Sequence, residues 1–172
     1  MSEPAPAAEF SRAVDIRQAQ GRDMHLTASE TERAALARRF DLVRVDNLEA
    51  KLFLTVRDRV VEATGTLSAD YVQSCAVSAE DLPVSVEEPL AFRFVPTRQN
   101  HAPDEELEID AEDCDEIDYA GSTIDLGEAV AQSLGLAIDP YATGSEAEEA
   151  RARLRDEDAG PFAALKGLKP DA

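Results

Sequence analysis

The stretch from Gly65 to Pro96, GTLSADYVQSCAVSAEDLPVSVEEPLAFRFVP, constrains the fold more than any other part of the chain. Two segments in it, Thr66 to Val77 and Leu82 to Val95, alternate apolar and polar residues, as strands with one buried face do. The polar Ser78 to Asp81 separates them. The pattern predicts the central hairpin of an antiparallel sheet, with Pro89 at a bend or bulge because proline donates no hydrogen bond to a ladder.

A second hairpin precedes this one. Leu42 to Asp46 and Leu48 to Val56 alternate in the same way, and Arg57-Asp58-Arg59 is a tight polar turn that leads into Val60 to Leu67. Sequential hairpins predict a meander. Shorter strand candidates lie further upstream, within Phe10 to Ile16 and Met24 to Leu26.

A helix is predicted before the first hairpin. Ser29 and Glu32 form a capping box, in which the Ser29 hydroxyl accepts from the Glu32 amide and the Glu32 carboxylate accepts from the Ser29 amide. The helix should run to about Phe40, with Leu36 and Phe40 on its buried side. We therefore predict an α+β fold, in which this helix packs on an antiparallel meander sheet of four or more strands.

The remainder of the chain is predicted to be an acidic connector followed by helices. Asp125 and Glu128 cap a helix whose apolar residues recur every four positions and which Pro140 ends. Another helix begins near Ser145, with a Glu149–Arg153 surface pair. We expect a disordered tail at 1–8 and one domain at 9–172, with the connector at 97–122 and the helical segment at 123–169. Leu107 and Ile109 are candidates for a short edge strand in the connector, and Phe162, Leu165 and Leu168 form the apolar face of a terminal helix at Pro161 to Lys169.

Charge divides the chain into two parts. The net charge is −19, which disfavours non-specific binding to nucleic acid because Lys and Arg supply most of that affinity. Ten of the seventeen basic residues lie between Arg12 and Arg59, whereas ten of the fifteen residues from Asp104 to Asp118 are acidic. The acidic run lacks the spacing and the glycine of a calcium-binding EF-hand loop.

Neither catalysis nor a membrane is indicated. His25 and His101 have no nucleophile motif beside them, and no phosphate-binding loop or HExxH motif is present. No apolar run could span a bilayer, the start of the chain does not resemble a signal peptide, and Cys75 and Cys114 are expected to be reduced thiols. We expect a cytoplasmic, non-enzymatic protein without a cofactor, a membrane partner or a small-molecule substrate. A small-ligand-binding domain or a general protein-interaction module is the alternative.

Three segments together resemble a known family. These are the central hairpin, the helix and Leu-Ala-Ile-Asp-Pro segment at Ile124 to Pro140, and the terminal PFAALKGLK at Pro161 to Lys169. In order and spacing they are similar to YceD-type proteins, over roughly Phe10 to Lys169. The resemblance implies a non-enzymatic factor in large-subunit ribosomal RNA accumulation in bacteria, often encoded beside a small ribosomal protein. It also implies a candidate metal site at a CxxC pair.

The metal site does not carry over to this chain. The first position of the pair is Cys75, but the second is Ser78, and a hydroxyl is a poor substitute for a thiolate on zinc. We therefore predict no metal, and we interpret Cys75 as a small residue at a strand end.

Two hypotheses describe how such a protein could act. In the first, arginines of the N-terminal part gather on one face and contact large-subunit rRNA; these are Arg12, Arg17, Arg22, Arg38, Arg39, Arg57 and Arg59. In the second, the acidic segment binds a basic large-subunit ribosomal protein; its residues are Asp104, Glu105, Glu106, Glu108, Asp110, Glu112, Asp113, Asp115, Glu116 and Asp118. The charge balance favours the second. The plain alternative is that both clusters only keep the protein soluble.

Overall fold

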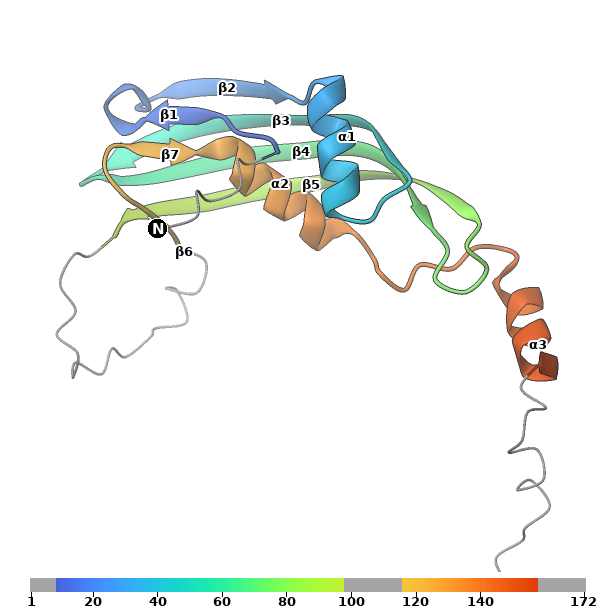
Figure 1. The fold of residues 1–172 in the computed structure, drawn as a ribbon. Helices are drawn as coiled ribbons and strands as arrows, with labels where there is room; N and C mark the ends of the chain where they lie inside the picture. Colours follow the sequence, from blue (N-terminus) through green and yellow to red (C-terminus); the bar gives the residue numbers. More distant parts are fainter. Residues whose placement is uncertain (1–8, 98–115, 158–172) are drawn as a thin grey trace, which may run out of the picture.

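The computed structural model describes residues 9–97 and 116–157. A five-stranded sheet in the order β2-β3-β4-β5-β6 lies beside a small β1-β7 pair and the helices (Figure 1). The prediction of an α+β fold with a mostly antiparallel sheet is confirmed. The elements are β1 Ala13–Asp15, the 3-10 helix η1 Ile16–Gln18, β2 Arg22–Thr27, α1 Glu30–Arg39, β3 Arg44–Arg57, β4 Val60–Ser74, β5 Asp81–Pro96, β6 Glu116–Tyr119, β7 Thr123–Asp125, α2 Leu126–Ala137 and α3 Ala147–Glu157.

Three long strands form the centre of the sheet. β3 joins the two segments predicted at Leu42 to Asp46 and Leu48 to Val56, with an irregularity between Val45 and Asn47. β3 and β4 meet at the predicted tight turn, where Asp58 and Arg59 have φ angles of 48° and 67°. Two positive φ angles in succession are typical of a two-residue type I′ turn, whose twist matches that of the strands.

The predicted bend or bulge at Pro89 is wrong. β4 and β5 pair without a register shift, and Pro89 lies opposite Thr66 inside that ladder. The Thr97 amide, just after β5, donates to the Tyr119 carbonyl of β6 at 2.9 Å. Because amides along a strand alternate between its two edges, the nitrogen of Pro89 lies on this same edge, away from β4. Proline is tolerated there because no hydrogen bond to β4 is lost.

The end of the predicted connector is also structured. Glu116–Tyr119 forms β6, which pairs parallel with β5 at Arg93–Pro96. A parallel neighbour needs a connection of a dozen or more residues, and residues 97–115 are long enough to provide one. The sheet is therefore not antiparallel throughout, and Glu116 and Asp118 belong to it.

The core lies between the sheet and two helices on the same side of it (Figure 1). α1 packs on β3, and α2 packs on β1, β4 and β5. The predicted capping box of α1 is present, and Asp125 caps α2. Leu36 is fully buried, whereas Phe40 is only partly buried. The largest fully buried side chains are Tyr71, Phe10, Phe94, Leu36, Leu48, Leu54, Leu67, Ile124, Leu126, Leu134, Val61 and Val72.

Three expectations concern segments outside the described residues: the tail at 1–8, the edge strand at Leu107 and Ile109, and the terminal helix with Phe162, Leu165 and Leu168. Within the described part, the Glu149–Arg153 pair in α3 is formed, with 3.6 Å between Oε2 and Nη2. No helix in that part is long and apolar enough to cross a membrane.

Gly65 in β4 provides a test of the packing between the central strands. A Cβ atom at this position would overlap the carbonyl oxygen of Lys51 on β3. We expect Gly65→Ala to lower the free energy of unfolding by about 1–3 kcal/mol, because the strands must move apart. Urea denaturation measures the change. Ser68→Ala, at an exposed position on the same strand, should stay within about 0.5 kcal/mol of the wild type. Equal urea midpoints for Gly65→Ala and the wild type would contradict the expected close approach.

Candidate functional site

Several arginines of the N-terminal part form ion pairs within the protein. Arg12 donates to both carboxylate oxygens of Glu32, at 2.6 and 2.9 Å, and to the carbonyl of Thr27. The two side chains of the ion pair are only 30% and 22% exposed. The Arg12 guanidinium lowers the pKa of Glu32 to about 2. Arg12 thus attaches the segment before β1 to the first turn of α1.

Arg39 connects the two helices. Its guanidinium donates to both carboxylate oxygens of Glu128 on α2, at 2.8 and 2.9 Å, and to Glu9 at 3.0 Å. The hydrogen bonds with Glu128 raise the pKa of Arg39 and lower that of Glu128. Arg39, one of the predicted rRNA contacts, is therefore already paired. Three further arginines pair with carboxylates: Arg17 with Asp15, Arg44 with Asp46, and Arg93 with Glu116.

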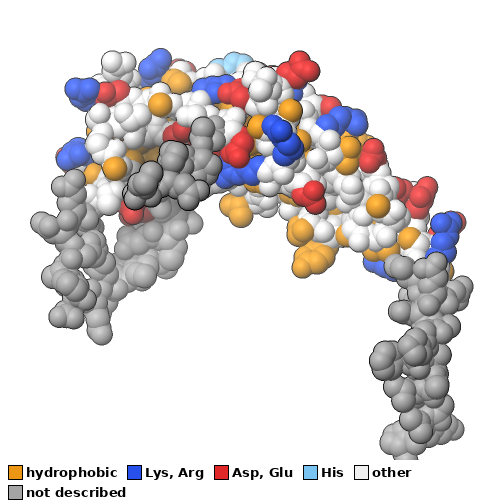
Figure 2. Space-filling model, viewed as in Figure 1, with side chains coloured by type: hydrophobic (Ala, Val, Ile, Leu, Met, Phe, Trp, Pro, Cys, Tyr) orange, Lys and Arg blue, Asp and Glu red, His pale blue; other side chains and the backbone are white. Residues whose placement is uncertain are grey.

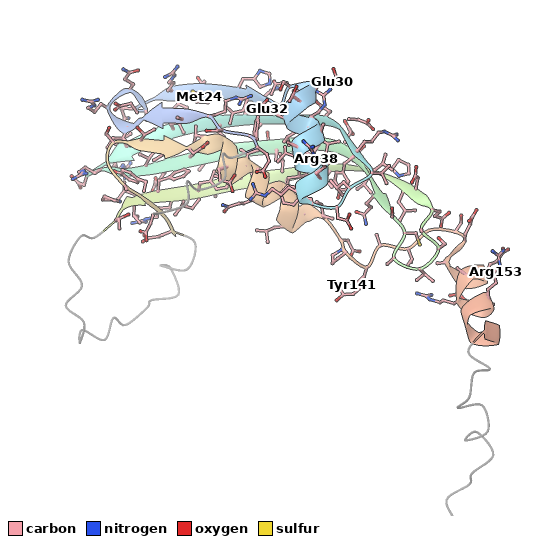
Figure 3. All side chains as sticks on the ribbon, in the orientation of Figure 1. Met24, Glu30, Glu32, Arg38, Tyr141 and Arg153 are labelled. Carbon is pink, nitrogen blue, oxygen red and sulfur yellow. The ribbon has the colours of Figure 1, made fainter. Side chains whose placement is uncertain are left out.

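The other predicted arginines lie at two ends of the sheet, and Arg22 begins β2 opposite Leu54, near the end of β3. Arg38 is on α1, beside the beginning of β3 (Figure 3), whereas Arg57 and Arg59 flank the turn at the end of β3. A 14-residue strand is about 45 Å long. Within the part of the chain that the structure describes, these three arginines form no ion pair. They do not form one surface, and their contact with a partner stays a prediction.

The predicted acidic residues divide into two groups. Glu116 in β6 pairs with Arg93, with 2.9 Å between Oε1 and Nε, and Asp118 is exposed on the same strand. The other eight lie outside the described residues: Asp104, Glu105, Glu106, Glu108, Asp110, Glu112, Asp113 and Asp115. From 116 to 150 the sequence contains no Lys or Arg, so the acidic character extends over α2 and the loop that follows it.

Cys75 begins the loop between β4 and β5, and it is 4% exposed. Its sulfur accepts hydrogen bonds from the backbone amides of Ser78 and Gly144, both at 3.4 Å. The bonds from Ser78 lower the pKa of the Cys75 thiol to about 7. These donors favour a thiolate, but a zinc site needs more ligands, and among the described residues no group of three or more His, Cys, Asp or Glu side chains converges. The residues around Cys75 do not fit the metal.

The end of β4 and the loop that follows it form hydrogen bonds with the segment that joins α2 to α3. The Gln73 side chain donates to the carbonyl of Asp139 at 2.8 Å, and the Glu80 carboxylate accepts from the Glu146 amide at 3.0 Å. Gln73 is the one buried polar residue among the described residues. No local pattern indicates these contacts, because each joins residues 66 positions apart.

The outer face of the sheet carries His25, which lies 3.4 Å from Glu49 through Nε2. Both side chains are well exposed, at 56% and 40%. No nucleophilic side chain is paired with His25 among the described residues. His101 lies outside the described residues.

Residues 63–169 match the model of a family described as "Large ribosomal RNA subunit accumulation protein YceD". The match covers more than half of the chain. The chain belongs to the YceD family. No curated protein and no solved structure matches it. The family description concerns accumulation of the large ribosomal RNA subunit, and the suspected membership is confirmed.

The YceD match has a clear position on the fold. It begins in β4 and includes the Cys75 loop, β5, β6 and α2. All seven arginine candidates, including Arg38, Arg39, Arg57 and Arg59, precede it, whereas all the acidic candidates lie within it.

The Arg12–Glu32 pair predicts a pH-dependent contribution to stability. The pKa of Glu32 is about 2 in the folded protein, below its ordinary value of 4.5, so the stabilisation is complete above pH 4.5 and is lost as the pH falls through 2. We expect Glu32→Gln to lower the free energy of unfolding at pH 7 by about 1–3 kcal/mol. The difference from the wild type should disappear near pH 2. Glu49→Gln, at the exposed pair with His25, is the control and should have little effect. A pH-independent difference would contradict the assignment.

The environment of Cys75 predicts an acidic thiol. In a Cys114→Ser background, where Cys75 is the remaining cysteine, thiolate absorbance should titrate with a midpoint of about 7 rather than 9. Ser78→Ala should raise this midpoint, because it removes the hydroxyl and retains the backbone donor. A midpoint near 9 in the Cys114→Ser protein that retains Ser78 would show that the hydrogen bonds to the Cys75 sulfur are not formed in solution.

Proposed function

We propose that this protein is a non-enzymatic factor in large ribosomal subunit biogenesis, and that it acts by binding a basic large-subunit ribosomal protein. Its family supports the connection to large-subunit RNA accumulation. The distribution of charge supports the choice of partner. Residues 63–169 contain 24 acidic and 7 basic residues, so this segment has a net charge of −17, out of −19 for the whole chain.

The pairing of the arginines strengthens this choice. Arg12, Arg17, Arg39 and Arg44 each pair with a carboxylate of the N-terminal part or of α2. A paired guanidinium would have to leave its carboxylate before it could neutralise an RNA phosphate. The carboxylates of the family segment exceed its basic residues more than three-fold, so they attract a cationic protein at long range. A role in ribosome assembly implies that the protein works in the cytoplasm.

The acidic segment provides the test. One variant replaces eight carboxylates with their amides, at Asp104, Glu105, Glu106, Glu108, Asp110, Glu112, Asp113 and Asp115. Wild type and variant are each purified from cells at moderate salt and treated with nuclease. Because eight negative charges are removed, we expect the variant to lose the basic large-subunit proteins that co-purify with the wild type. Mass spectrometry of the eluates measures this loss.

The matched control replaces Arg38, Arg57 and Arg59 with Gln. It should retain the protein partner, because it keeps every carboxylate of the acidic segment and none of these arginines forms an ion pair with a described residue. If this control instead loses a nuclease-sensitive association with large-subunit RNA while the acidic variant keeps all its partners, the protein contacts rRNA through its arginines.

A further inference from the structure

Two large apolar side chains project into solvent after the buried face of α2 ends. Leu136 is 89% exposed and Tyr141 is 82% exposed. The other exposed large apolar side chains, Val43 and Phe53, reach only 46%. Figure 3 shows Tyr141 pointing away from the body of the protein, and Figure 2 shows apolar side chains protruding along the same border. Leu136 lies in α2 and Tyr141 in the loop that follows it, so the two exposed side chains are five residues apart along one border of the protein.

A hollow lies beside Leu136. It has a volume of about 230 Å³ and lies between α2 and β5, lined by Glu88, Pro89, Leu90, Ser133, Leu136 and Ala137. A closed apolar cavity of about 150 Å³ can hold a benzene molecule, so this hollow has room for one aliphatic or aromatic side chain. Its one charged lining residue is the exposed Glu88, at the rim.

The neighbouring edge of β5 is unsuited to an added strand. β6 covers β5 only at Arg93–Pro96, which leaves Asp81 to Phe92 without a second partner among the described residues. The Thr97 amide points to this edge, and amides of every second residue along a strand share an edge. The nitrogens of Pro83 and Pro89 therefore lie on this edge as well. Two missing donors oppose strand pairing, so a partner must bind through side chains.

The charge around the hollow is of one sign. β5 from Asp81 to Phe92 and the chain from 116 to 150 contain no Lys or Arg. Glu88 lines the hollow, and the carboxylate of Asp139 accepts from the Tyr141 amide at 2.9 Å. This surface would repel a second copy of the chain and the phosphates of RNA, and it would attract a cationic protein segment.

We propose that Leu136, Tyr141 and the hollow between α2 and β5 dock a Lys- and Arg-rich protein segment. One apolar side chain of that segment enters the hollow beside Leu136. Its cations face Glu88 at the hollow and Asp139 beside Tyr141, and one of them stacks on the exposed ring of Tyr141. The inference rests on the proposed function and specifies where the basic partner binds.

The experiment uses the full-length chain and the proteins extracted from purified large ribosomal subunits. Leu136→Ser/Tyr141→Ser should weaken binding of the retained basic protein about ten-fold, because two anchor side chains are lost. Leu136→Lys/Tyr141→Lys should weaken it further, by repulsion. Glu88→Gln/Asp139→Asn should weaken it several-fold and reduce its dependence on salt.

Two controls keep the test specific. Val43→Ser/Phe53→Ser removes exposed apolar side chains elsewhere, and Asp23→Asn/Glu30→Gln removes two charges elsewhere. Both should bind as the wild type does. All variants should keep the wild-type urea midpoint, because the replaced side chains lie at the surface.

The outcomes separate the two proposals. If the wild type retains a basic protein and the Leu136/Tyr141 variants bind it equally well, the docking surface is wrong and the proposed function stands. If the wild type retains none of the extracted proteins, the proposed function fails and the docking surface fails with it. A parallel experiment uses a cell lysate that contains intact large subunits. If the wild type retains only RNA from it, and nuclease treatment removes that RNA, both proposals are overturned in favour of RNA binding.

Discussion

The carboxylate of Asp125 joins the two halves of this chain. It accepts from the amides of Gly127 and Glu128 and so caps α2. It also accepts from the amide of Arg12 at 2.7 Å and from the hydroxyl of Ser11 at 2.5 Å. Without this group, the first turn of α2 and the segment before β1 would both leave polar groups unpaired in a partly buried place. The β1-β7 pair continues the same junction, since Ala13 lies opposite Asp125.

The arginines extend this junction and so explain the division of charge. Arg12 attaches the N-terminal segment to α1, and Arg39 attaches α1 to α2 through Glu128. Each pair is partly buried, so the loss of one partner would leave the other charge desolvated and unpaired. Arginines of the N-terminal part therefore pair with four of its carboxylates, Glu9, Asp15, Glu32 and Asp46, and with Glu128 of α2. The carboxylates of residues 63–169 outnumber the Lys and Arg residues of that segment. Most of the negative net charge therefore remains unneutralised and can attract a partner.

Local patterns predicted the elements, whereas contacts between distant residues had to be observed. The alternation of β3, β4 and β5 and the capping box at Ser29 depend on neighbouring residues, and both were predicted correctly. β6 has four residues inside an acidic run, with only Ile117 and Tyr119 to indicate a strand. Its pairing with β5 is decided by tertiary contacts that no periodicity records. The pairing of Arg12 and Arg39 joins residues 20 and 89 positions apart, so the sequence could suggest only that these arginines shared a surface.

The surface at the end of α2 was missed for a similar reason. The residues spaced by four along α2 predicted its buried side, and Leu136 lies off that spacing without any signal of its own. Only the packing shows that Leu136 and Tyr141 have nothing to cover them among the described residues. The two kinds of group on this surface have different physical effects. Carboxylates act over about a Debye length and accelerate encounter with a cationic partner, whereas apolar anchors act only on contact and slow dissociation. The proposed function requires a protein that finds a basic partner quickly and later releases it, and a small apolar site within an acidic field has both properties.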